Sequence, residues 1–211
     1  MRTITWASTF LIFLAIPFAC TAQHNLKIHT LKLDEGHTLI LLDSAEAAVT
    51  LLHDQTDRFF ERVTASEMSI QMKTPLEQGQ TRESLLPAFQ DFLRRDVSDF
   101  TPEESRLASS VVEEMFKTCR SVTGGIFPDT LFLIKTKGKH YGKSVYYTRE
   151  NVIVIPDDVL DAAGRSAFTS TMYNELFHVY SRLNPEKRRQ LYKLIGFQPI
   201  GLENLEIPDG L

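Results

Sequence analysis

The chain has 211 residues, of which 43% are hydrophobic and 24% are charged. This length and balance are typical of an ordinary globular protein with one sizeable core, and they exclude low-complexity and fibrous classes. The formal net charge of -4 gives no reason to expect a nucleic acid or an acidic membrane surface as partner, because both attract excess positive charge.

Residues 1–22 are typical of an export signal that is not part of the fold. Arg2 precedes a short apolar run over residues 10–19, and small residues follow it. The run is too short for a comfortable membrane span. We therefore expect export to the bacterial periplasm, the cell envelope or the medium. Cys20 offers an alternative, a lipidated first residue that would touch the membrane, although Pro17 stands where a leucine-like residue is usual.

Cys119 is the only cysteine outside this segment. An internal disulfide is therefore excluded, and we expect Cys119 to be a small core residue. We expect residues 23–211 to form a single domain, with a mainly helical part over 23–120 and a sheet plus one long helix over 121–211.

Hydrophobic periodicity and turn residues predict the elements of the first part. A hairpin is expected over 24–42, because apolar runs flank the turn at 34–37. A helix capped by Asp43 and Ser44 is expected to run to about residue 63. The remaining expectations are a short strand over 66–72, a loop over 73–79, a helix over 82–95, and a helix that starts at Thr101-Pro102 and reaches Cys119.

The second part predicts strands followed by helices. Strands are expected over 130–134, 143–149 and 152–155. Residues 135–143, between the first two of these strands, are expected to form a basic turn that contains two glycines. This turn could favour acidic peptides, although a solvated turn is the simpler interpretation. A helix is expected over 166–183, then a second helix over 186–194 and an irregular tail. Helices followed by strands favour the α+β class.

One stretch of the helix over 166–183 carries chemistry: Asn174-Glu175-Leu176-Phe177-His178. Helical spacing places Asn174, Glu175 and His178 on one face. We expect this helix to be apolar nearly all round and buried. A buried carboxylate and imidazole cost several kcal/mol unless they are paired or bound to a metal. The alternative is a core in which Glu175 and His178 bond to each other or to the backbone.

Three neighbouring segments accompany this stretch: the strand and turn over 147–156, Ser181-Arg182, and Leu191 to Phe197, which ends in Ile-Gly-Phe. Together they resemble the zincin metallopeptidases, and more narrowly gluzincin-like bacterial proteins whose helix reads His-Glu-Leu-Phe-His before Ser-Arg. The resemblance covers about residues 125–205. It implies a zincin-like α+β fold, with the helical part packed on a small sheet that is followed by the motif helix.

The resemblance also implies roles. Glu175 corresponds to the general base that acts on zinc-bound water, and His178 to the second zinc ligand. Asn174 occupies the position of the first ligand, where a neutral carboxamide is a poor substitute for imidazole. A more distal carboxylate completes such sites, and Glu203 or Glu206 is the candidate here. Zinc binding is therefore expected to be weak.

The resemblance further implies a strand whose edge binds extended peptide, within 130–136 or 143–148.

Three hypotheses about the function remain open. The first is an exported metallopeptidase-like protein with impaired or lost zinc-dependent hydrolysis, whose groove binds a peptide or protein. The second is an active zinc metallopeptidase with an atypical ligand set, completed by Asn174 or by a residue such as His140. The third is a non-enzymatic envelope binding protein. His140, Tyr147 and Tyr173 are candidates to assist a reaction, or are packing residues.

Overall fold

The computed structural model describes residues 29–194 and 196–197. The predicted export signal with Cys20, and the candidate ligands Glu203 and Glu206, lie outside these residues. Within the described part, no helix is both long and apolar enough to cross a membrane.

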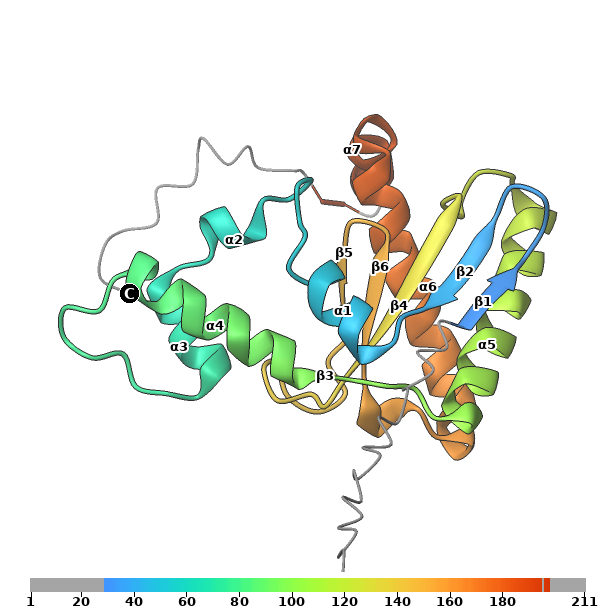
Figure 1. Cartoon of the computed structure of the whole chain (residues 1–211). Helices are drawn as coiled ribbons and strands as arrows, with labels where there is room; N and C mark the ends of the chain where they lie inside the picture. The colour runs from blue at the N-terminus through green and yellow to red at the C-terminus, as the bar shows by residue number, and fades with distance from the viewer. Residues whose placement is uncertain (1–28, 195, 198–211) are drawn as a thin grey trace, which may run out of the picture.

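A small mixed sheet forms the centre of the fold (Figure 1). Its strands lie in the order β1-β2-β4-β6-β5. The two inner pairings, β2 with β4 and β4 with β6, are parallel, whereas the outer strands β1 and β5 pair antiparallel. The bounds are β1 His29–Lys32, β2 Thr38–Leu41, β4 Thr130–Thr136, β5 Tyr147–Arg149 and β6 Val152–Pro156, and β3 Val97–Ser98 pairs with the end of β4.

Helices cover both faces of this sheet. On one face lie α5 (Pro102–Val122) and α6 (Arg165–Leu183), and on the other lie α1 (Ser44–Thr50), α3 (Ala65–Met72) and α4 (Arg82–Asp96). The shorter elements are α2 Phe59–Arg62, η1 Asp157–Val159, η2 Ala162–Gly164 and α7 Pro185–Leu194. The fold is mixed α and β, compatible with the expected α+β class.

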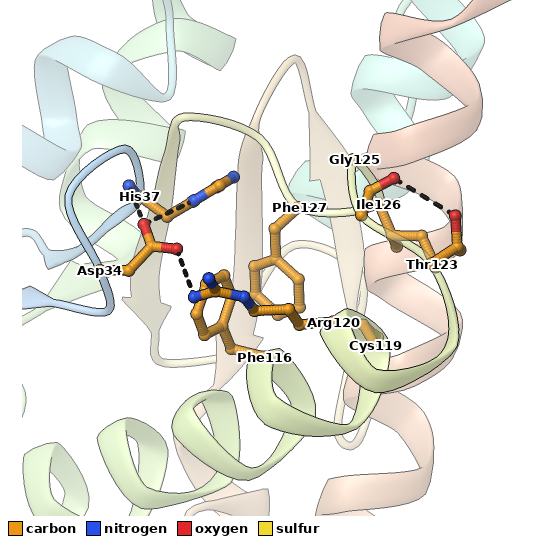
Figure 2. Close-up of a pocket in the computed structure, with 10 residues that line it drawn as sticks. Asp34, His37, Phe116, Cys119, Arg120, Thr123, Gly125, Ile126 and Phe127 are labelled. Atoms are coloured by element: carbon orange, nitrogen blue, oxygen red, sulfur yellow. Dashed lines mark hydrogen bonds and ion pairs between the residues drawn. The ribbon is translucent and has the colours of Figure 1, made fainter.

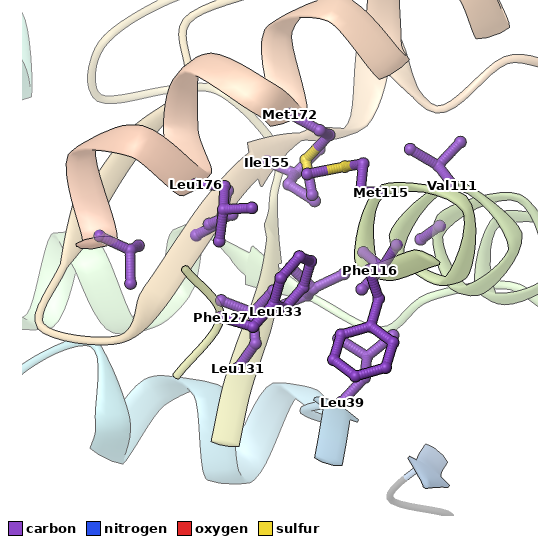
Figure 3. Close-up of a cluster of buried hydrophobic side chains, with 14 of the residues drawn as sticks. Leu39, Val111, Met115, Phe116, Phe127, Leu131, Leu133, Ile155, Met172 and Leu176 are labelled. Atoms are coloured by element: carbon purple, nitrogen blue, oxygen red, sulfur yellow. The ribbon is translucent and has the colours of Figure 1, made fainter. Parts of the chain in front are cut away.

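Two apolar cores lie on the two sides of the sheet, because successive strand residues point to opposite faces. Leu133 of β4 belongs to the core under α5 and α6, which Figure 3 shows, and its neighbour Ile134 belongs to the core under α1, α3 and α4. Both side chains are fully buried. Cys119 lies in the first core, as predicted, and its thiol is free.

Several predicted elements are confirmed by their capping residues. The Thr101 hydroxyl accepts a hydrogen bond from the Glu104 backbone N–H, the Glu104 carboxylate accepts one from the Thr101 N–H, and Pro102 occupies the first turn of α5. The hairpin, the helix over 82–96 and the helix over 165–183 are also present.

Three predicted elements are wrong. Residues 66–72 form the helix α3 rather than a strand, because Thr64 and Glu67 make a reciprocal capping box that starts a helix. The expected helix over 44–63 ends at Thr50, and the following loop turns about Asp54, whose carboxylate accepts from the backbone N–H of Asp57 and Phe59. The strand expected over 143–149 is confined to 147–149.

Candidate functional site

Helix α6 is buried on one side only, so the expectation of an apolar helix buried all round is wrong. Phe168, Met172, Leu176 and Val179 pack against the sheet and α5. On the other side Asn174 and His178 are exposed and Glu175 is half-buried. The three polar residues of the motif therefore face away from the core.

Strand β5 lies beside this polar side of α6. Between the two elements lies a shallow, open cavity of about 320 Å³. It is lined by Tyr146, Tyr147 and Thr148 from the strand segment and by Glu175, His178 and Arg182 from the helix. Two of the three residues of the motif, Glu175 and His178, thus meet the strand. Asn174 is not among the described residues that line the cavity.

Strand β5 is an edge of the sheet, since it pairs with β6 alone among the described strands. The expectation of an edge strand over 143–148 is thus met by β5 in part. The alternative segment, 130–136, is wrong because it forms the central strand β4, whose two sides are occupied by β6 and by β2 and β3. A central strand has no free edge to offer a peptide.

The environment shifts the pKa of both motif side chains. Partial burial raises the pKa of Glu175, and the positive charge of Arg182 opposes this shift only in part. Burial, followed by the same charge of Arg182, lowers the pKa of His178. Both neutral forms are favoured, which suits groups that exchange protons.

Glu175 and His178 do not form the self-satisfied cluster that was one alternative. Within residues 29–194, neither side chain forms a hydrogen bond or an ion pair, either with the other or with the backbone. Since neither side chain has a hydrogen-bond or ion-pair partner among the described residues, both are open to a ligand or to solvent.

Arg182 connects three elements at one end of this cavity. Its Nε donates to Oδ2 of Asp57 in the loop before α2, and its Nη1 donates to Oγ1 of Thr148 in β5 at 2.8 Å. The guanidinium group therefore holds the loop and the edge strand against α6, and it places a positive charge beside Glu175 and His178.

The described donors do not fit a catalytic zinc ion. Such a site takes three protein ligands from His, Glu, Asp or Cys and keeps one position for water. In the described part of the chain, no group of three such side chains lies close enough together to hold a metal. Among the described residues that line the cavity, His178 offers the one imidazole and Glu175 is the proposed base, while Arg182 adds a charge that repels a cation.

His140 does not complete this site, contrary to one hypothesis. Its Nδ1 bonds the Asp96 carboxylate and its Nε2 lies 2.8 Å from the Tyr147 hydroxyl. Tyr147 packs on the opposite face of the sheet from its neighbour Tyr146, which faces α6. Both ring nitrogens of His140 are therefore already engaged by Asp96 and Tyr147. Tyr173 packs against the core and does not line the cavity.

The Asp96–His140–Tyr147 network is a buried polar connection that sequence reasoning missed. His140 is 4% exposed and Asp96 is 1% exposed. Although burial by itself raises the pKa of Asp96, hydrogen bonds from the His140 ring and from the backbone N–H groups of Lys139 and His140 lower it overall. The network fixes the turn after β4 to the end of α4, and it accounts for His140 as a structural residue.

A second cavity lies where the hairpin turn meets the end of α5 (Figure 2). Asp34 accepts from His37 Nδ1 at 2.8 Å and from Arg120 Nη1 at 2.9 Å. Phe116 and Cys119 lie beneath them, and burial raises the pKa of the Cys119 thiol. These contacts close the turn onto α5, and they leave the thiol protonated and unreactive at neutral pH.

Comparison with known proteins finds no matching family model, curated protein or solved structure. The geometry of the cavity between β5 and α6 is therefore the ground on which a function is proposed.

Proposed function

We propose that the protein is an exported, metallopeptidase-like protein of zincin type whose groove between β5 and α6 binds an extended peptide or protein segment. In this proposal zinc-dependent hydrolysis is impaired or lost. The observation that carries the proposal is the cavity in which Glu175 and His178 of α6 face the edge strand β5.

Peptide binding is supported by the free edge of β5. An edge strand presents unpaired backbone N–H and C=O groups, and an extended peptide satisfies them by adding one more strand. The side chains of such a peptide alternate, so every second one would enter the cavity that Tyr146 and Glu175 line. Affinity then comes from the backbone, and selectivity from the cavity.

Impaired hydrolysis is supported by the donor set around His178. Asn174 stands one helical turn before His178, where the resemblance requires an imidazole, and its carboxamide oxygen binds zinc poorly. The charge of Arg182 beside the same site works against a divalent cation. Glu203, the candidate third ligand, remains a proposal because it lies outside the described residues.

Peptide binding is tested by hydrogen–deuterium exchange on the full chain, with and without a dye-labelled peptide of alternating valine and threonine. We expect the added peptide to slow exchange at residues 146–149. The edge strand β1 is an internal control, because among the described strands it also pairs on one side only but has no motif residues beside it. Slowed exchange at β1 alone, or at neither strand, contradicts the proposal and favours the hypothesis of a non-enzymatic envelope protein.

The loss of hydrolysis is tested by the metal content of the purified protein. We expect less than one zinc in ten molecules, and no cleavage of the bound peptide over a day. One zinc per chain together with cleavage would instead establish an active metallopeptidase with an atypical ligand set.

A further inference from the structure

The groove beside β5 continues past the cavity that holds Glu175. Next to that cavity lies another one, also of about 320 Å³ and distinct from the cavity in Figure 2. It is lined by Ser144, Asp158, Asp161 and residues of α6 that include Phe168 and Thr171. Tyr146 lines both cavities. Residues of α6 at intervals of three or four follow the two cavities from end to end: Thr171, Glu175, His178 and Arg182. One face of the helix therefore forms the floor of a single groove.

Charged side chains lie at both ends of this groove, and the arginine at one end is paired with Asp57. Arg182 lies at the Thr148 end, whereas Asp158 and Asp161 lie at the Ser144 end. Asp158 accepts from the backbone N–H and the hydroxyl of Ser144 at 3.1 and 3.0 Å, and Asp161 accepts from the Ala163 N–H at 3.1 Å. All these donors are neutral. Among the described residues no cation forms an ion pair with either carboxylate, so both negative charges remain uncompensated.

Tyr146 lies close enough to Asp158 and Glu175 for their negative charges to affect the pKa of its hydroxyl. Burial is the main reason that its pKa is raised, and the negative charges of Asp158 and Glu175 raise it further. Its ring also lies against Phe168, with 6.3 Å between the ring centroids. The Ser144 end of the groove thus combines an apolar wall of Tyr146, Phe168 and Val159 with two carboxylates at its rim. A long aliphatic stem that ends in a positive charge complements this combination.

We infer that the groove selects an extended peptide with a lysine or arginine side chain, which occupies the cavity between Tyr146, Asp158 and Asp161 while the peptide backbone lies along β5. This inference rests on the proposed peptide binding and names its substrate class. It reverses the expectation from the basic turn after β4. Two lysines of that segment are engaged within the protein, since Lys135 at the end of β4 is buried against Glu104 and Lys137 donates to the Arg95 carbonyl.

The test compares three dye-labelled peptides of alternating valine and threonine that differ only in a central lysine, norleucine or glutamate. Dissociation constants are measured by fluorescence anisotropy with the full chain at 50 mM and 500 mM NaCl. We expect the lysine peptide to bind about five- to tenfold more tightly than the norleucine peptide at low salt, and the glutamate peptide to bind most weakly. The lysine preference should shrink at high salt, because partly exposed charges are screened.

The Asp158→Asn, Asp161→Asn double variant locates the preference. The lysine peptide should bind to this variant no more tightly than the norleucine peptide does. The affinity of the variant for the norleucine peptide should stay within about twofold of the wild-type value, since asparagine retains an oxygen acceptor for the turn contacts. Asp157→Asn is the matched control, because Asp157 lies on the same turn but does not line the groove. That control should retain the full preference.

The outcomes separate the inference from the proposed function. Equal binding of all three peptides by the wild type, or a lysine preference that survives in the double variant, overturns the inference and leaves peptide binding intact. If none of the three peptides binds, the proposed function fails and the inference fails with it. The comparison of peptides on the wild type decides the matter even if the double variant does not fold.

Discussion

At the scale of single residues, Glu175 is kept where its charge is disfavoured. Partial burial raises its pKa in the folded protein, and in the unfolded chain water restores the ordinary value. Folding is therefore penalised at pH values where the carboxylate must be charged, and the penalty disappears as the pH falls through the folded-state pKa. A residue that costs stability at a cavity is typical of a functional site.

The substitution Glu175→Gln is expected to stabilise the protein. At pH 8 the gain in unfolding free energy should be on the order of 0.5 kcal/mol, a value kept small because the side chain is partly solvated. The gain should vanish at low pH, where wild-type Glu175 is itself neutral. Urea unfolding at several pH values measures the gain. Glu35→Gln, a change at an exposed turn carboxylate, is the control and should have no effect. A destabilised Glu175→Gln variant at pH 8 would show that the carboxylate has a partner.

The substitution Asn174→His tests the proposed zincin ancestry of the site. It supplies the missing imidazole one turn before His178, and we expect zinc to bind at least a hundredfold more tightly than to the wild type, as measured by calorimetry. A pair of histidines on any helix binds some zinc, so the control is Lys117→His with Ser121→His, an exposed pair of equal spacing on α5. Equal zinc affinity in the two variants would mean that no third ligand approaches His178.

The sequence predicts which side chains of α6 form this site better than it predicts which element lies beside them. Helical spacing correctly places Glu175 and His178 on one face. It does not reveal that this face is open, because exposure depends on which strand lies beside the helix. The pairing of β5 with β6 at the sheet edge is a long-range property, and periodicity along the chain carries little information about it.

At the scale of elements, the Asp96–His140–Tyr147 network joins α4, the turn after β4 and the edge strand. Two of its members lie 44 residues apart in sequence, which explains why the sequence suggests no connection between them. From the sequence, His140 is a loop residue whose ring nitrogens could bind a ligand. In the structure the ring is buried, and both nitrogens already have partners. The network holds β5 from the side opposite the groove.

The substitution Asp96→Asn is expected to destabilise the fold by about 2–3 kcal/mol at pH 7, because it removes a buried charge that accepts from His140 and two backbone N–H groups. Since the pKa of Asp96 is lowered in the folded state, its contribution is present above the ordinary carboxylate pKa and is lost as the pH falls through the folded value. Chemical denaturation at pH 7 and pH 3 measures the change. Asp91→Asn, at an exposed position of α4, should alter stability by less than about 0.5 kcal/mol.

The elements show where local sequence signals are sufficient. The capping box at Thr101 predicts the start of α5 correctly. An equivalent box at Thr64 and Glu67 marks α3, and apolar residues at positions 68, 70 and 72 mimic the alternation of a strand. The break after Thr50 is harder to predict, because Asp54 turns the loop with the help of Arg149, which is distant in sequence and lies 3.6 Å away.

At the scale of the whole molecule, two apolar cores share one sheet. Leu133 and Ile134 are adjacent residues of the central strand, and they are buried in different cores. Loss of either core deprives β4 of packing on one face, so the two cores cannot unfold independently of the sheet. The single domain expected for residues 23–211 stays a prediction, which unfolding measurements test.

The substitutions Leu133→Ala and Ile134→Ala are each expected to lower the unfolding free energy by about 2–5 kcal/mol. Each variant should also unfold in one transition, with coincident midpoints for helix content by far-UV circular dichroism and for tyrosine packing by near-UV circular dichroism. Separate midpoints in either variant would indicate two independently folding parts and would contradict the single-domain prediction.

The short length of β5 has a consequence for the behaviour of the protein in concentrated solution. Exposed edge strands are the usual points at which sheets of different molecules join and aggregate. Only Tyr147–Arg149 have strand geometry here, and the left-handed backbone of Glu150 turns the chain directly afterwards. An edge of three residues offers few backbone hydrogen bonds, so we expect it to hold a strand of another molecule only weakly unless that strand also makes contacts in the groove. The same edge, supported by the groove beside it, suits brief and reversible contact with a flexible chain.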